Sequence, residues 1–164
     1  MGWRAMASAD LMAVSAISDA VHGHYTEPMA IYAERLTLYA EGCFLFEREG
    51  MPCGYLITHP WRHEGPPPLG ALIGAIPVEA DSYYLHDLAL LPAARGTGAG
   101  GEGVRLAMEQ AGKAGFRDVY LLAVNGADSF WTLQGFTIVP GEKRAAQLRA
   151  DYGPEVLYMH RRLP

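Results

Sequence analysis

A glycine-rich segment carries the clearest chemical signal in this sequence: Arg95-Gly96-Thr97-Gly98-Ala99-Gly100. Glycine lets a backbone approach a ligand closely, and the free N–H groups at the start of a helix attract an anion. Arg95 adds a planar, permanently charged donor that suits a diphosphate. A merely flexible turn needs only one or two glycines, whereas five of the six positions from Gly96 to Gly101 are glycine or alanine. We therefore predict a phosphate-binding loop.

Two other phosphate-binding patterns were compared with this loop. A nucleotide P-loop ends in Gly-Lys-Ser/Thr, which is absent here. Gly96, Gly98 and Gly101 do satisfy the spacing of the dinucleotide fingerprint G-x-G-x-x-G. However, Pro92 separates this motif from the preceding strand. The fingerprint also needs an acidic residue at the end of the next strand, whereas Asp118 lies before that strand. Dinucleotide binding stays open as an alternative.

The segment before the loop, Tyr83–Leu90, is a predicted strand that carries candidate catalytic groups. Strict alternation places Tyr84, His86 and Leu88 on one face and Leu85, Asp87 and Ala89 on the other, unless a bulge mixes them. His86 is the candidate general base, because a histidine titrates near pH 6.5. The alternative is a histidine hydrogen-bonded for structure. Asp87 is a candidate for orienting a neighbouring side chain or binding the amine. Asp87, or Tyr84 acting through a water molecule, is the alternative general base.

Metal, nucleic-acid and membrane functions are not expected. His59 and His63 are four residues apart, but Pro60 prevents the helix that would align them, and His22 and His24 have no third ligand at metal spacing. A net charge of −5 argues against the basic face that nucleic acids require. No apolar stretch is long enough to cross a bilayer. We expect a cytoplasmic protein.

The elements that must position the loop follow from periodicity and turn residues. Helices are expected from Leu11 to Val21, after Pro28, from the glycine loop to Ala114, and over Asp128–Gln134. Strands are expected over Trp3–Met6, Cys43–Glu47, Cys53–Thr58, Tyr83–Leu90, Val119–Val124, Phe136–Val139 and Val156–His160, with a polar loop before the last. Proline and glycine make His59–Asp81 an expected loop, ordered and facing the substrate.

A turn at Glu49-Gly50 would place Cys53 opposite Phe46, so no Cys43–Cys53 disulfide is expected.

These segments together resemble the GCN5-related N-acetyltransferase (GNAT) superfamily. Arg95–Gly100 resembles its Q/R-x-x-G-x-G/A pyrophosphate loop, and Leu88-Ala89-Leu90-Leu91-Pro92 is similar to the strand end that pairs with pantetheine. Val124-Asn125-Gly126-Ala127, Phe130-Trp131 and Gly135-Phe136 resemble the family's V-N-x-x-A and F-Y-x-x-x-G-F segments. The resemblance covers Tyr83 to Val139.

The resemblance implies one domain over residues 1–164, of the α/β (α+β) class. Its central sheet would be mixed and mostly antiparallel, with a V-shaped split and about four flanking helices. Acetyl-CoA would be the cosubstrate, transferring its acetyl group to a primary amine, expected to be a small molecule. The implied CoA-binding residues are Leu88, Ala89, Leu90, Arg95, Gly96, Thr97, Gly98, Ala99, Gly100, Asn125 and Trp131. No metal is implied.

Two departures from the family keep other functions open. Trp131 stands where many members have a tyrosine acid, and an indole N–H is not a useful proton donor at neutral pH. Tyr84 stands where several members have a glutamate base. A non-catalytic acyl-CoA sensor is therefore an alternative. The sequence does not distinguish a monomer from a homodimer.

Overall fold

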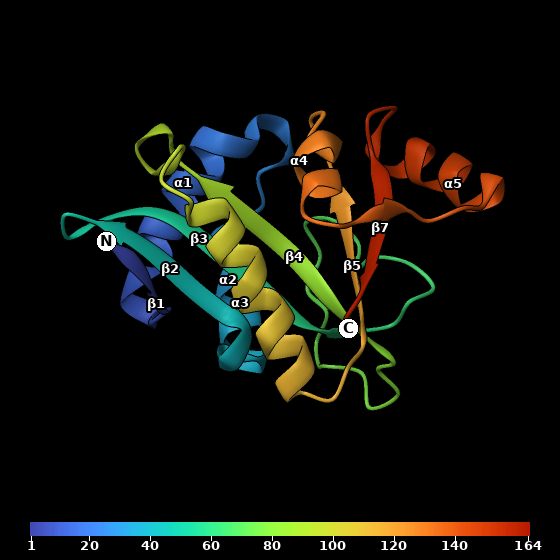
Figure 1. The fold of residues 1–164 in the computed structure, drawn as a ribbon, viewed down its shortest axis with the longest axis horizontal. Helices are drawn as coiled ribbons and strands as arrows, with labels where there is room; N and C mark the ends of the chain where they lie inside the picture. The colour runs from blue at the N-terminus through green and yellow to red at the C-terminus, as the bar shows by residue number, and fades with distance from the viewer.

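A single mixed sheet forms the centre of the protein (Figure 1). The computed structural model describes the backbone of residues 1–164 and the side chains at all positions except 142 and 144. Across these residues the seven strands have the order β1-β2-β3-β4-β5-β7-β6. Their bounds are β1 Gly2–Ala5, β2 Cys43–Arg48, β3 Met51–Trp61, β4 Ser82–Leu90, β5 Asp118–Ala123, β6 Thr137–Ile138 and β7 Leu157–Arg162. Only the β4–β5 pair is parallel, so the predicted mixed, mostly antiparallel sheet is confirmed.

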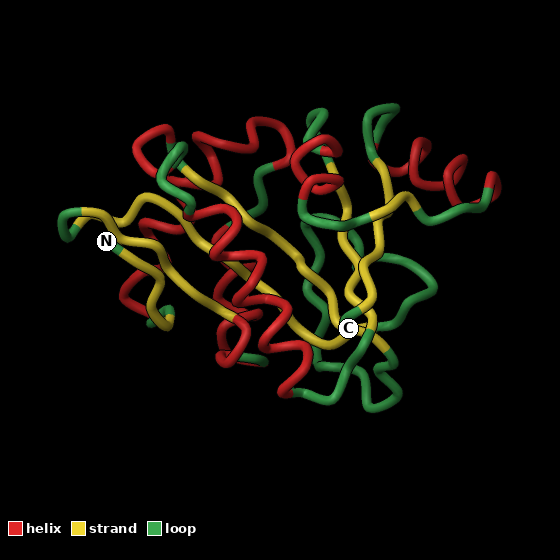
Figure 2. The backbone as a smooth tube through the Cα atoms, viewed as in Figure 1, coloured by secondary structure: helices red, strands yellow, loops and turns green.

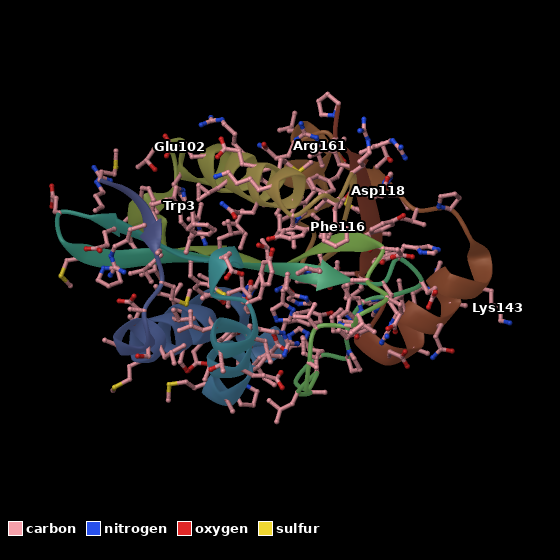
Figure 3. All side chains as sticks on the ribbon, turned by 90° about the horizontal axis from the view of Figure 1, so that it is seen from below. Trp3, Glu102, Phe116, Asp118, Lys143 and Arg161 are labelled. Atoms are coloured by element: carbon pink, nitrogen blue, oxygen red, sulfur yellow. The ribbon has the colours of Figure 1, made fainter. Side chains whose placement is uncertain are left out.

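Helices cover both faces of this sheet. They are α1 Leu11–His22, α2 Met29–Leu38, α3 Ala99–Lys113, α4 Asp128–Leu133 and α5 Glu142–Tyr152. Figure 3 shows α3 on one side of the sheet, with Trp3 and Phe116 beside it, and α1 and α2 on the other. The apolar positions that recur at helical spacing in α3 and α1, such as Val104 and Val14, are fully buried against the sheet. Each face therefore has its own hydrophobic core.

The sheet opens between β4 and β5. These strands pair only at Tyr83↔Val119 and Tyr84↔Tyr120, although β4 continues to Leu90. Beyond Tyr84 the two ribbons diverge in Figure 1. The backbone groups of β4 that face this opening are not used for pairing with β5. The predicted V-shaped split is confirmed, and it creates the space described below.

A β-bulge in β4 determines which side chains face that space. Ile57 of β3 pairs with Asp87, but Thr58 pairs with Leu85, so His86 is an extra residue in β4. Leu85 consequently packs in the core on the α3 side, whereas Asp87 contacts α1 on the other side. His86 also faces that side, where it contacts Glu27. The predicted alternation, with Leu85 and Asp87 on one face and His86 on the other, is wrong for this physical reason.

The hairpin of β2 and β3 differs from expectation in its register. Glu49 and Gly50 both have positive φ, 54° and 74°, as a two-residue hairpin turn requires. A bulge after Phe46 shifts the pairing, so Phe46 lies opposite Gly54 rather than the predicted Cys53. Cys43 and Cys53 are both free thiols, and both are buried.

The end of β3 and the content of the segment before β7 also differ from the prediction. β3 continues through Pro60 to Trp61, past the predicted end at Thr58. The proline is tolerated because β2 pairs no further than Ile57, which leaves one edge of this part of β3 without a partner strand. The predicted polar loop before β7 contains α5, whose apolar pattern is weak and in which Leu148 is the buried hydrophobic residue.

The segment between β3 and β4 contains no helix or strand (green in Figure 2). Over the described residues, no helix combines the length and apolar character needed to span a bilayer.

Candidate active site

Two adjoining cavities lie in the split of the sheet. The first, of about 320 Å³, lies between β4 and β5 and reaches α1 and α5. The second, of about 460 Å³, lies against the glycine-rich loop. Their shared lining consists of Val21, Leu88, Arg95, Ala127 and Trp131. The two spaces therefore form one continuous site, with a loop end and an α1 end.

The glycine-rich loop has the backbone conformation expected for anion binding. Gly96 and Gly98 have φ of 75° and 87°, values that other residues rarely adopt, and α3 begins immediately after them at Ala99. The first N–H groups of α3 have no partner within the helix. Arg95 is exposed, and its Nε donates a hydrogen bond of 3.3 Å to the Leu90 carbonyl. Arg95 and Gly96 to Gly101, except Thr97, line the cavity at this end together.

Most of the predicted CoA-binding residues line these cavities. Those at the loop end are Leu88, Leu90, Arg95, Gly96, Gly98, Ala99, Gly100 and Trp131. Asn125, with φ of 55°, lines the α1 end. Ala89 and Thr97 line neither cavity. The side chain of Ala89 is buried in the α1-side core, and the hydroxyl of Thr97 donates to the Ala94 carbonyl and accepts from the N–H of Ala99.

Aromatic side chains close the loop end on the α4 side. Trp131 is almost fully buried and makes an edge contact with Phe130, with ring centroids 4.9 Å apart. Phe130, which was not among the expected CoA-binding residues, also lines the loop cavity. A Cβ atom on Gly100 would lie 3.1 Å from the Phe130 ring. The glycine therefore lets the start of α3 approach α4 closely.

Asp87 holds a histidine that comes from α1. Its Oδ1 lies 2.6 Å from His22 Nε2, and its Oδ2 accepts a hydrogen bond of 2.6 Å from the Tyr55 hydroxyl. Burial alone would raise the pKa of Asp87, but the charges of His22 and His86 and these hydrogen bonds lower it below its ordinary value. Burial would also lower the pKa of His22, but Asp87 and Glu27 raise it overall. An ionised carboxylate thus orients the imidazole.

A second histidine–carboxylate pair lies beside the first. His86 Nε2 lies 2.7 Å from Oε1 of Glu27, a buried carboxylate. Burial would raise the pKa of Glu27, but His86 and the N–H of Gly70 lower it overall. The other ring nitrogen of His86, Nδ1, is buried without a partner among the described residues. The pKa of the neighbouring His59 is lowered to about 3, chiefly by burial and secondly by the charge of His86. His59 is therefore neutral.

Tyr84 lies at the base of the split, where β4 and β5 still pair. Burial raises its pKa well above the ordinary value, with Tyr158 and Tyr152 contributing. Its phenol is therefore neutral at physiological pH. The three predicted catalytic residues Tyr84, His86 and Asp87 all line the α1 end.

The segment after β3 covers the α1 end. Pro67 and Leu69 line the cavity. Glu27 Oε2 accepts a hydrogen bond of 2.8 Å from Gly70 N–H, and the Tyr152 hydroxyl of α5 donates one of 3.1 Å to the Pro67 carbonyl. Glu27 therefore connects this segment to His86.

The same segment carries a group with metal-ligand chemistry outside the cavity. His63, Glu64 and Asp81 are exposed, with ligand atoms within 4.8 Å of one another. His63 and Asp81 already pair with each other. Sequence spacing did not suggest this grouping, because Asp81 is brought there by the return of the chain into β4.

Sequence reasoning missed His22, Glu27 and Tyr152 as parts of the site. His22 is 65 positions from its partner Asp87, and Glu27 is 59 positions from His86. One local signal was present: His22 is the last residue of an amphipathic helix, next to the apolar Val21.

Comparison with known proteins identifies the architecture. A family model described as the acetyltransferase (GNAT) family matches residues 10–136. The chain belongs to the GNAT acetyltransferase family. The predicted family resemblance is thereby confirmed, over a longer range than the segment that carried it. Among curated protein sequences, no match was found.

Solved structures agree with a GNAT fold over the whole chain. A "GNAT-like decarboxylase" GphF, in complex with isobutyryl-CoA, aligns over 100% of both chains with a TM-score of 0.70 and 16% identity. Naa50 of Arabidopsis thaliana, in complex with a bisubstrate analogue CoA-Ac-MVNAL, covers 97% of this chain and 96% of its own, with a TM-score of 0.69 and 18% identity. The ribosomal-protein-alanine N-acetyltransferase of Brucella melitensis covers 99% of this chain and 100% of its own, with a TM-score of 0.67 and 22% identity. At these identities the likeness establishes the fold alone.

Proposed function

We propose that this GNAT protein transfers an acetyl group from acetyl-CoA to the primary amine of a small molecule. The observation that carries the proposal is the continuous cavity through the split sheet. One end presents the donors of the glycine-rich loop, and the other end presents paired histidines and carboxylates. A cosubstrate and an acceptor can therefore meet in the middle.

The loop end fits a CoA molecule. Arg95 and the first N–H groups of α3 would hold its diphosphate. A Cβ atom placed on Gly96 or Gly98 would have nothing within 4 Å, so the space beside this backbone is open. Between Leu88 and Leu90, the edge of β4 that faces the split is not paired with β5. Such an edge can hydrogen-bond the amides of a pantetheine chain, as it would another strand.

The reaction needs orientation and proton removal. An acceptor that arrives as an ammonium ion first gives up one proton. Its nitrogen then attacks the thioester carbon, the C–N bond forms and the C–S bond breaks. A second proton leaves the nitrogen as the amide forms, and the departing thiolate takes up one of the two, so one proton reaches solvent. The pKa of the CoA thiol is close to that of cysteine, about 8.5, so water can protonate the departing thiolate. Trp131 therefore need not supply a proton.

The α1 end favours a small cationic acceptor. Glu27 and Asp87, both ionised, line the same cavity as Pro67, Leu69 and Tyr152, none of which lines the loop end. Negative charge attracts an ammonium ion, and a cavity of about 320 Å³ suits a small acceptor. All residues that line the two cavities come from one chain, so either a monomer or a homodimer can hold the site. The two free cysteines support a reducing, cytoplasmic location.

The test is acetyl transfer from labelled acetyl-CoA to a panel of small amines, polyamines and peptides. Turnover of at least one small amine is the expected result. Turnover of a protein lysine or N-terminus, with every small amine inert, would overturn the acceptor class. Binding of CoA without transfer to any acceptor would favour an acyl-CoA sensor. Thermal stabilisation by NAD and not by CoA would favour the dinucleotide alternative.

A further inference from the structure

The α1 end of the cavity contains two histidine–carboxylate pairs, and they differ in which imidazole nitrogen is free. In both pairs the Nε2 atom contacts the carboxylate. The Nδ1 atom of His86 is buried and has no partner among the described residues. The Nδ1 atom of His22 is not among the buried unpartnered atoms, and the His22 side chain, 15% exposed, lines the cavity. Of the two, His22 can present a free nitrogen to an acceptor.

We propose that His22 is the general base of the transfer, and that Asp87 is its positioning residue. This inference rests on the proposed function and names the group that takes the proton from the acceptor. The ionised Asp87 accepts from Nε2–H, which leaves the lone pair on Nδ1. A buried carboxylate that fixes the tautomer of a histidine is an established way to prepare a general base.

Asp87 itself is held from two directions. His22 occupies one of its oxygens and Tyr55 the other. Tyr55 is fully buried and packs against Tyr32, whose hydroxyl lies 2.6 Å from that of Ser18 in α1. The imidazole is therefore oriented by a network that crosses from β3 and β4 to α1. The bulge at His86 is what brings Asp87 to this face.

The proton balance is simple. His22 Nδ1 takes one proton from the acceptor ammonium and becomes an imidazolium paired with Asp87. The neutral amine attacks the thioester carbon, the C–N bond forms and the C–S bond breaks. The second proton of the nitrogen passes to the departing thiolate as the amide forms, and the imidazolium releases its proton to solvent. His86 has a different role in this arrangement: through Glu27 it connects β4 to the segment at Gly70 that covers the cavity.

The pH dependence follows from the groups that face His22. Asp87 and Glu27 carry negative charge, and the cavity also contains Arg95, His86, Tyr25, Tyr84 and Tyr152. The two carboxylates outweigh burial and raise the pKa of His22. His22 must be neutral to act as a base, so kcat/KM should rise with pH through that raised pKa. Replacing Asp87 with asparagine removes a negative charge and should move this rise to lower pH.

The experiment measures kcat/KM against pH with the best amine of the panel, for His22→Ala, His22→Gln, His86→Gln and Asp87→Asn. His24→Ala is the matched control, because His24 is an exposed histidine two positions away. The expected loss for both His22 variants at neutral pH is about 10²–10⁴-fold, with the rise through the histidine pKa abolished. Acetyl-CoA affinity, measured by calorimetry, should stay unchanged. Imidazole added to His22→Ala should restore part of the rate.

Asp87→Asn should lower the plateau and shift the rise to lower pH, which a purely structural role would not do. His86→Gln should keep the rise. Wild-type rates and pH profile in His22→Ala would overturn the inference while leaving the proposed function intact. Loss of the rise in His86→Gln alone would transfer the base role to His86 and also overturn it. A wild-type protein that binds acetyl-CoA and acetylates no amine would instead refute the proposed function itself.

Discussion

The two ends of the cavity are built in different ways. The loop end comes mainly from one continuous stretch, the end of β4, the glycine-rich loop and the start of α3. The α1 end is assembled from α1, β4, the segment after β3 and α5, whose residues are tens of positions apart. Backbone groups and glycine conformation dominate at the first end, and side-chain pairs dominate at the second. A continuous stretch can bind a common cosubstrate, while the assembled end can vary with the acceptor.

If this contrast is correct, changing Gly98 to valine should produce the largest effect. A side chain at φ of 87° is strained, and it would occupy the open space beside the loop. Binding of CoA, measured by calorimetry, should be lost. Gly50→Val is the matched control, because Gly50 has φ of 74° in the β2–β3 turn and lines neither cavity. Tight CoA binding by Gly98→Val would show that the loop backbone is not the binding surface.

Arg95→Ala should have the next largest effect. A hydrogen bond between charged groups contributes about 1.5–3 kcal/mol, so CoA affinity should fall by roughly 10- to 150-fold. The melting temperature of the free protein should not change, because Arg95 is exposed. Arg105→Ala, an exposed arginine of α3 outside both cavities, should bind CoA as the wild type does. Equal affinities for the two variants would contradict the role of Arg95.

Tyr55→Phe sharpens the account of the α1 end. It removes the hydroxyl that donates to Asp87 Oδ2 and leaves the ring in place. Loss of one hydrogen bond in a buried network should cost about 1–3 kcal/mol of unfolding free energy. The value of kcat should fall about tenfold or less, with KM for acetyl-CoA unchanged, because Asp87 still holds His22. Steady-state kinetics would check this, and a change confined to CoA affinity would contradict the division between the ends.

The smallest effect concerns stability against pH. The pKa of His22 is raised in the folded protein by Asp87 and Glu27. Its contribution to stability is complete below the unfolded pKa of about 6.5 and is lost as pH rises through the folded pKa. The pKa of Asp87 is lowered, so its contribution is complete above about pH 4. Urea unfolding should therefore show a larger difference between wild type and His22→Gln at pH 5 than at pH 9. An equal difference would show that the pair is not ionic.

The sequence was sufficient for the parts of the molecule that depend on local pattern. The glycine-rich loop, its strand and helix, and the Gly-Phe segment near Phe136 lie within short windows, and the family resemblance gave the split sheet. The α5 helix was missed because little of it faces a core, so its apolar period is weak. The faces of β4 were misassigned because one extra residue, His86, reverses the alternation, and a bulge leaves no clear pattern in the sequence.

The partners at the α1 end could not be predicted at all from spacing. His22 and Asp87 meet only because α1 packs on the face of the sheet to which the bulge turns Asp87. Sequence reasoning included Asp87 and His86 among the candidates, and both line the α1 end, yet it had no means of finding the residues that pair with them. The chemistry of a carboxylate depends on those partners, so a residue's place in the fold decides its role.

The most direct test of the account is a crystal structure of the protein with CoA and an amine that it acetylates. In that structure the diphosphate should lie on Arg95 and the N–H groups of residues 96–100, and the amine nitrogen should lie within hydrogen-bond distance of His22 Nδ1. A diphosphate bound elsewhere would contradict the loop end. An amine held by His86, or outside the cavity, would contradict the α1 end.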